Sequence, residues 1–187
     1  MAPSRRDHLV DTALALFSRD GYHATGIDKI LAEAGVAKMT LYNHFKSKDE
    51  LILAALRRRD ERFRNWFMRQ VEQCAAEPRA RLLAVFDVLQ EWFDSRDFSG
   101  CNFINAAAEY GDPENPIHAA CAEHKRLLLG YLKQLSAAAG APDPAALADQ
   151  LMLLVEGATV MRYTACQRDA GRTARRTAEI LLARALD

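Results

Sequence analysis

A short run of polar side chains, from Lys38 to His44, has the clearest potential for chemistry in this chain. It holds an ammonium group, two hydroxyls, an amide and an imidazole within about seven residues. Val36, Leu41 and Phe45 recur around it at helical spacing, so a short helix is expected to bury them and to leave the polar groups and Met39 on the other face. Such a face suits the base edges and phosphates of a DNA major groove.

The residues before this run predict another helix and a tight turn. Ile27, Ile30, Leu31 and Ala34 repeat at helical spacing and are expected to form a buried face. Gly35 follows where the helix must stop and the chain must turn, a position that often requires a positive φ. Two short helices joined in this way predict a helix-turn-helix.

The chemistry of each side chain predicts its role at the DNA. Thr40 and Asn43 are the best candidates for base contacts, since an amide matches N6 and N7 of adenine. Tyr42 can donate to a phosphate or pack against a thymine methyl group, and His44 is expected to contact the backbone. Thr25 is expected to begin a helix and to hold a phosphate at its positive end, and the flanking lysines pair with phosphates. The predicted DNA-binding residues are Thr25, Lys38, Met39, Thr40, Tyr42, Asn43, His44 and Lys48.

Three further cations have two equal interpretations. Arg5 and Arg6 can reach a phosphate or a minor groove from the N-terminal arm. Alternatively they, and Lys29, belong to an ordinary solvated surface.

The rest of the chain has helical period, and no segment alternates as a strand does. Ser4 and Ser47 begin capping patterns, and Asn115 and Asp143 each precede a proline that suits the first turn of a helix. The sequence therefore predicts an all-α protein of about nine helices. Residues 1–50 form a compact unit and residues 51–187 a larger body, and a long helix over about 47–76 joins them.

Composition limits the classes of protein to consider. The 25 basic and 25 acidic residues cancel, with a mild basic excess in the first third of the chain. The four cysteines follow neither a disulfide framework nor a zinc pattern. Neither a signal peptide nor a membrane-spanning run is recognisable, so a cytoplasmic protein without membrane contact is expected.

One extended pattern resembles a known family. Residues 8 to 55 resemble the TetR/AcrR family of bacterial repressors. The resemblance lies in the order and spacing of a capped helix, a glycine turn and a K-x-T-L-Y-x-H-F-x-S-K-x-E-L segment. Met39 departs from the pattern, because many members have glycine, proline or serine there. The residues that carry the resemblance are Gly21, Tyr22, Thr25, Ile30, Ala34, Gly35, Val36, Lys38, Thr40, Leu41, Tyr42, His44, Phe45, Ser47, Lys48, Glu50 and Leu51.

The resemblance implies a homodimeric, ligand-responsive repressor. Residues 1–50 would be the helix-turn-helix DNA-binding domain, and residues 51–187 the helical ligand-binding and dimerisation domain. A palindromic double-stranded operator would be bound, and a small-molecule effector of unknown identity would release it. Dimer contacts would come from the last two helices, at about 143–167 and 172–186.

A ligand pocket between helices of the body is expected to be apolar with a few polar anchors. Aromatic residues at helical spacing are also ordinary core residues, and buried polar residues either anchor a ligand or bond to arginine or backbone. His118 and His124 are six residues apart, which is poor spacing for two metal ligands, so no metal or other cofactor is predicted. The ligand-binding candidates are Phe86, Trp92, Phe103, Asn102, Tyr110, His124 and Glu156.

The sequence does not favour an enzyme. It contains no G-x-S-x-G, H-E-x-x-H or phosphate-loop motif. A helical dimer that acts as an adaptor, with a helix-turn-helix that no longer binds DNA, remains an alternative to the repressor.

Overall fold

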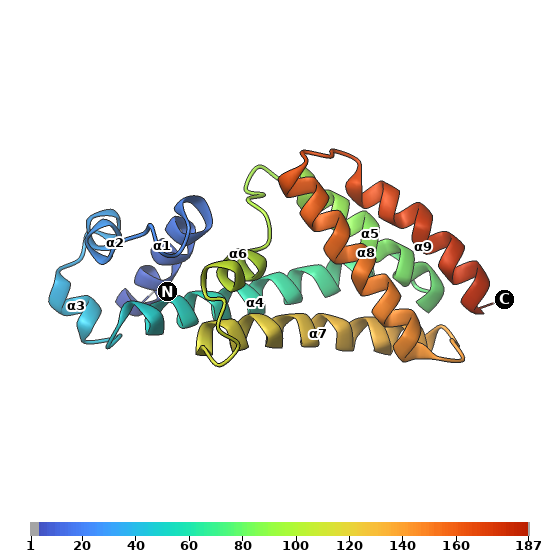
Figure 1. Ribbon diagram of the computed structural model, residues 1–187, viewed down its shortest axis with the longest axis horizontal. Coiled ribbons are helices and arrows are strands. Elements are labelled where there is room, and N and C mark those ends of the chain that lie inside the picture. Colours follow the sequence, from blue (N-terminus) through green and yellow to red (C-terminus); the bar gives the residue numbers. More distant parts are fainter. Residues whose placement is uncertain (1–3, 187) are drawn as a thin grey trace. The chain divides into compact units, whose positions relative to one another are not determined.

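The computed structural model describes residues 4–186, which form nine helices and no strand (Figure 1). The predicted all-α fold class is confirmed. The chain divides into two compact units. Unit 1 contains the residues up to Arg62 together with Cys101–His124, and unit 2 contains Phe63–Gly100 and the residues from Lys125 onward. No helix of the described residues has an apolar stretch long enough to cross a membrane.

Unit 1 is built from the three N-terminal helices, from α6, and from the first parts of two long helices, α4 and α7 (Figure 1). The bounds are α1 Arg5–Asp20, α2 Ile27–Ala34, α3 Lys38–Tyr42, α4 Lys48–Cys74, α6 Asn102–Glu109 and α7 Pro116–Ala138.

Helix α1 begins where the sequence predicts. The Ser4 hydroxyl accepts the backbone N–H of Asp7 at 3.1 Å, which satisfies one of the free amides of the first turn. Ion pairs join α1 to α4, because Arg58 contacts the carboxylates of both Asp7 and Asp11.

The turn between α2 and α3 has the predicted geometry. Gly35 has φ 63° and ψ 34°, the left-handed conformation that ends a helix at little cost for glycine. The N–H of Val36 donates to the carbonyl of Leu31 at 3.2 Å, which closes the turn. Ile30 and Leu41 are fully buried, whereas Ile27 is only half-buried, contrary to expectation.

Helix α4 begins with reciprocal capping. The N–H of Glu50 donates to the Ser47 hydroxyl at 3.2 Å, and the Glu50 carboxylate accepts the N–H of Lys46 at 2.8 Å. This is the capping box predicted from the sequence, displaced by one residue on the return bond.

Unit 2 packs α5, α8 and α9 together with the later parts of α4 and α7. Gln90 fixes the start of the last helix, because its Oε1 accepts the N–H of Gly171 at 3.1 Å. Its Nε2 donates to the carbonyl of Arg168 at 2.9 Å. The bounds are α5 Pro78–Asp94, α8 Pro144–Thr164 and α9 Ala170–Leu186.

The boundaries of the two compact units follow the packing of the helices. A division of function at residue 50 stays a prediction, but the packing groups α6 and the first part of α7 with the N-terminal helices. The first compact unit is therefore made of two separate stretches of the chain.

Candidate nucleic-acid interface and ligand pocket

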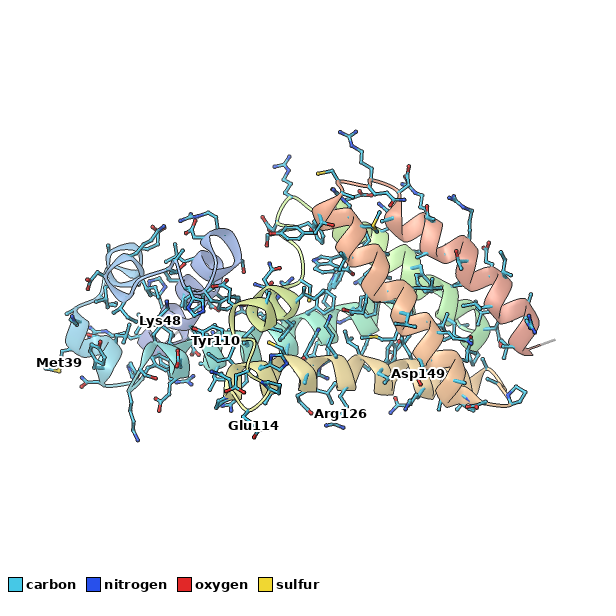
Figure 2. All side chains as sticks on the ribbon, in the orientation of Figure 1. Met39, Lys48, Tyr110, Glu114, Arg126 and Asp149 are labelled. Atoms are coloured by element: carbon cyan, nitrogen blue, oxygen red, sulfur yellow. The ribbon has the colours of Figure 1, made fainter. Side chains whose placement is uncertain are left out.

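Helix α3 buries one side chain and presents the others. Leu41 has no exposed surface, whereas Met39 is 71% exposed and Tyr42 46% exposed. Lys38 is exposed and Thr40 is half-buried. Figure 2 labels Met39 where it projects outward from α3. The short helix therefore carries the donors and the cation on an accessible face, as the sequence predicts.

The predicted recognition helix is shorter than expected. It ends at Tyr42, so Asn43 and His44 lie in the turn that follows it. Both side chains are exposed. Asn43 remains available to a base or a phosphate, although from a turn instead of a helical face.

The structure contradicts the expected role of the Thr25 hydroxyl. Thr25 is fully buried, and its Oγ1 donates to the carbonyl of Gly21 at 2.7 Å. Helix α2 begins two residues later, with Gly26 as its N-cap. The hydroxyl of Thr25 holds the turn between α1 and α2 and is not presented to a phosphate.

Lys48 is half-buried at the start of α4 and is labelled in Figure 2. Its Nζ donates to the carbonyl of His23 at 3.2 Å. Burial lowers the pKa of Lys48, against the opposing effect of the nearby Glu109 and Asp49 carboxylates. One of its three donors thus supports the turn, and a phosphate contact by the others stays a prediction.

Two of the other cations have partners within the chain. The Arg6 guanidinium lies 5.2 Å from the centroid of the Phe45 ring. Lys29 forms an ion pair with Asp20 at 3.1 Å. For these two the structural interpretation is favoured over a DNA contact.

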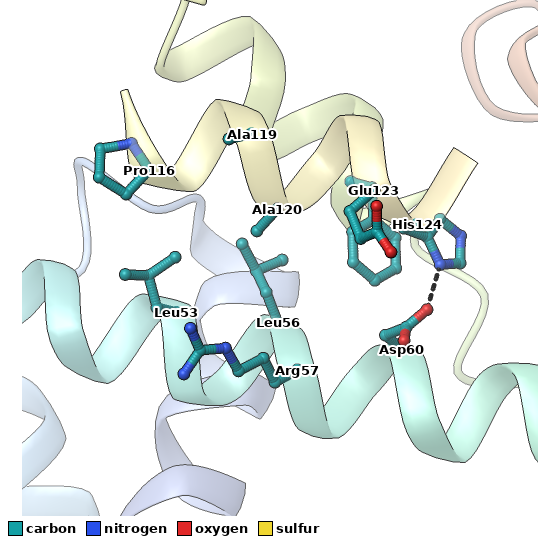
Figure 3. Close-up of a pocket in the computed structure, with 10 residues that line it drawn as sticks. Leu53, Leu56, Arg57, Asp60, Pro116, Ala119, Ala120, Glu123 and His124 are labelled. Carbon is teal, nitrogen blue, oxygen red and sulfur yellow. Dashed lines mark hydrogen bonds and ion pairs between the residues drawn. The ribbon is translucent and has the colours of Figure 1, made fainter. Parts of the chain in front are cut away.

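Unit 1 also contains a pocket of about 360 Å³ between α4, α6 and α7 (Figure 3). Its apolar side chains come from all three helices, and its polar groups are Arg57, Asp60, Glu123 and His124. The residues that line it are Leu53, Leu56, Arg57, Asp60, Phe103, Pro116, Ala119, Ala120, Glu123 and His124.

One end of the pocket is closed by a buried histidine. His124 is 2% exposed, and its Nδ1 lies 2.7 Å from Oδ1 of Asp60 (Figure 3). The Phe103 ring stacks on the imidazole with a centroid distance of 3.6 Å. The wall of the pocket is therefore a chain of contacts from α4 through α7 to α6.

The seven predicted ligand-binding residues are not brought together. Phe103 and His124 line the pocket, whereas Asn102 donates to Ser18 of α1 and Tyr110 stacks on His23 in the turn after α1. The other three belong to unit 2: Phe86 is a fully buried core residue, Trp92 packs on Phe63 and Phe98, and Glu156 forms an ion pair with Lys125 at 2.6 Å.

Sequence reasoning missed most of the pocket. Leu53 and Leu56 have the spacing of core residues, and Arg57 and Asp60 read as a solvated helix face. Small residues of α7, including Ala120, line the cavity. Their spacing in the sequence is that of ordinary apolar residues and does not indicate a cavity. No local pattern links the two helices, so the pocket follows only from the packing.

No metal centre is formed by the described residues, where no three His, Cys, Asp or Glu side chains come close enough to hold an ion. His118 instead has a backbone partner, with its Nδ1 2.8 Å from the carbonyl of Tyr110.

Comparison with known proteins identifies the family. Residues 9–55 match the model of bacterial regulatory proteins of the tetR family, and residues 78–178 match the tetracyclin repressor-like C-terminal domain. The chain belongs to the TetR family. Its members are transcriptional regulators that bind DNA through the N-terminal helix-turn-helix, so this chain is a regulator and not an enzyme.

Three relatives show how far the similarity extends. The structure of a TetR-family regulator from Streptomyces coelicolor superposes with a TM-score of 0.87 at 33% identity, covering 98% of this chain and 96% of the other. The transcriptional regulator YjdC of Escherichia coli is 26% identical over 95% of this chain and 93% of its own length. The transcriptional repressor ComR of Escherichia coli is 29% identical over 83% of this chain and 78% of its own length.

Proposed function

We propose that this regulator is a repressor that binds a palindromic operator as a homodimer and is released by a small molecule. The observation that carries the proposal is the accessible face of α3, where Lys38, Met39 and Tyr42 are exposed around the buried Leu41. A short helix anchored by one core residue and flanked by exposed donors matches the major groove in size and chemistry. Acting on DNA, the protein would work in the cytoplasm.

An apolar surface on the last two helices supports the homodimer. Leu153 is 74% exposed on α8, and Ile180 is 71% exposed on α9. Val160 and Met161 add further exposed apolar surface to α8. A two-fold interface uses the same patch on both copies, and a patch of this kind is costly to leave in water.

We propose the pocket of unit 1 as the effector site. It offers an apolar surface from Leu56 and Phe103 and a small polar set around Asp60, which is the usual composition of a site for a small organic molecule. Release requires that the effector bind the form with low DNA affinity more tightly than the form that fits the operator.

The DNA-binding step is tested by selecting sequences from random duplexes with the purified protein, followed by footprinting of its own upstream region. A palindromic site with half-sites about 34–36 Å apart is expected. Affinity should fall steeply as salt rises, because phosphate contacts release counterions. A selection that enriches no sequence would favour the adaptor alternative.

Tyr42→Ala tests the interface itself. This substitution removes an exposed ring and leaves the core untouched, so operator affinity should fall by roughly 10-fold while the melting temperature stays nearly constant. Unchanged operator affinity would count against the assignment of α3 to the groove. The sign of regulation is read separately, from a reporter whose expression should rise when the regulator is deleted.

A further inference from the structure

The turn between α1 and α2 is held by a carboxylate from α6. Oε1 of Glu109 accepts the backbone N–H of Tyr22 at 2.8 Å, and Oε2 accepts the backbone N–H of His23 at 2.5 Å. Hydrogen bonds from two successive amides to one carboxylate are charge-assisted and geometrically demanding. Glu109 therefore fixes both the position and the direction of this turn.

Four more contacts attach α6 and the residue after it to the end of α1 and to this turn. Nε2 of His23 lies 2.9 Å from the carbonyl oxygen of Glu109. The imidazole ring of His23 stacks on the Tyr110 ring, with 4.7 Å between the ring centroids. At the other end of α6, the Tyr22 hydroxyl donates to the carbonyl of Asn102 at 3.2 Å. The Asn102 side chain donates to the Ser18 hydroxyl of α1 at 2.5 Å. Both ends of this eight-residue helix are thus tied to the end of α1 and the turn after it.

The same short helix forms part of the pocket wall. Phe103 follows Asn102 directly and stacks on His124, which is bound to Asp60 of α4. Phe103 lines the pocket and is 3% exposed, so a molecule that fills the pocket contacts this closely packed ring, and one larger than the cavity presses on it.

The position of the turn between α1 and α2 determines where α2 begins. Its ends are closed by the bond from the Thr25 hydroxyl to the Gly21 carbonyl, and Lys48 contacts its middle. Helices α2 and α3 pack on each other and on α1. A shift of the turn therefore carries α2, and with it the reading face of α3.

We propose that Glu109 is a positioning residue that couples the pocket to the DNA-reading helices through the backbone of Tyr22 and His23. Filling the pocket displaces α6, loosens the two amide bonds and changes the placement of α2 and α3. This inference rests on the proposed function, because it assumes that α3 reads DNA. Beyond that function, the inference specifies how the coupling is transmitted: through α6, from Phe103 to Glu109, within one compact unit.

The first experiment removes the charge of the acceptor. Glu109→Gln should weaken binding to the selected DNA by about 5- to 150-fold, the range of an ordinary coupling between two sites. Backbone amide exchange of Tyr22 and His23 should become faster. Glu114→Gln, at an exposed loop position, is the matched control and should change neither quantity.

The second experiment fills the pocket without any ligand. Ala120 is half-buried and lines the pocket, so the phenyl group of Ala120→Phe serves as the occupant. Ala122→Phe adds the same group to an exposed position of α7 and is the control. Ala120→Phe should weaken DNA binding and speed exchange at Tyr22 and His23. If that variant fails to fold, Ala120→Met provides a smaller occupant.

The two substitutions are then combined in a double-mutant cycle. If Glu109 carries the coupling, filling the pocket should weaken DNA binding much less in the Glu109→Gln background than in the natural protein. A purely structural role for Glu109 would lower the melting temperature and leave the effect of Ala120→Phe unchanged, which overturns the inference. Unaltered DNA affinity in Glu109→Gln also overturns it. If the natural protein binds no DNA, the proposed function fails, and the amide exchange still tests the route itself.

Discussion

Gly21 and Gly26 lie at the two ends of one turn and differ in what they permit. Gly21 has φ 88° and ψ 164°, a region that only glycine adopts readily. A Cβ on it would lie 3.1 Å from Oε1 of Glu109. Gly26 has φ −77°, and nothing lies within 4 Å of the position of its Cβ.

Gly21→Ala should therefore destabilise the protein by about 1–3 kcal/mol and disturb the bond from Glu109 to the turn. Gly26→Ala is the matched control and should be neutral or slightly stabilising, since it reduces the freedom of the unfolded chain. Chemical denaturation of both variants measures the difference. Equal stabilities would show that the backbone at Gly21 is not constrained as described.

The hydroxyl of Tyr131 is buried in unit 2 and finds no hydrogen-bond partner among residues 4–186. Removing it in Tyr131→Phe should leave the melting temperature unchanged or raise it, because an unpaired polar group is costly to bury. A clear loss of stability in thermal unfolding would mean that the hydroxyl is paired.

The same residue predicts a pH dependence. Burial raises the pKa of Tyr131 to about 12. Between pH 10 and 12 the unfolded phenol ionises while the folded one stays neutral, so this contribution to stability is present below about pH 10 and is lost as the pH rises. Denaturation midpoints measured from pH 8 to 11 should fall less steeply in Tyr131→Phe than in the natural protein.

At this scale the sequence predicts residue type better than residue role. The sequence indicates that Thr25 has a polar partner, and for the buried polar candidates such as Asn102 it leaves a structural bond to arginine or backbone open. It assigned Thr25 to a phosphate because it could not show that the hydroxyl closes onto Gly21. Whether a hydroxyl faces in or out depends on the path of the turn, which residues distant in the sequence determine.

Among the elements, α3 is the one least able to stand alone. Five residues give little more than one helical turn, which is far below the length at which a helix is stable in water. Its position depends on Leu41, which is fully buried.

Leu41→Ala should cost about 2–5 kcal/mol and abolish DNA binding through local unfolding. Met39→Ala removes a similar volume from the exposed face of the same helix and should leave the melting temperature unchanged. Measuring both DNA affinity and thermal unfolding of the two variants distinguishes a residue that holds α3 in place from one that contacts DNA. If Leu41→Ala kept full stability, α3 would have to be held by other contacts.

The helices themselves were largely predictable because their ends carry local signals. Ser47 caps α4. The side-chain oxygen of Asn115 accepts the N–H of Ile117, and that of Asp143 accepts the N–H of Ala146. These bonds are made within four residues, so the sequence alone reveals them. The early end of α3 was missed, because no glycine or proline marks it.

For the whole molecule, the exposed apolar face of α8 and α9 predicts dimer formation. Leu153→Glu replaces the most exposed of these apolar side chains by a charge and should shift the protein toward monomer in analytical ultracentrifugation. Gln134→Glu adds the same charge at an exposed position of α7 and is the control. A dimer that persists in Leu153→Glu would move the interface elsewhere.

The pocket and the attachment of α6 could not be predicted, because both depend on contacts over long sequence distances. Glu109 and Tyr22 are 87 residues apart, and His124 and Asp60 are 64 apart. Helical spacing identifies which side chains are buried and does not identify their neighbours.

The interrupted first unit restricts how this protein can be recombined. The chain leaves the unit after Arg62 and returns to it at Cys101. A fragment that stops at residue 62 lacks the acceptor for the amides of Tyr22 and His23, so we expect it to unfold at a lower temperature than the intact protein. A chimera designed to exchange DNA specificity should therefore transfer both stretches of unit 1 together. The segment to exchange is defined by the packing of these stretches and not by a single cut in the sequence.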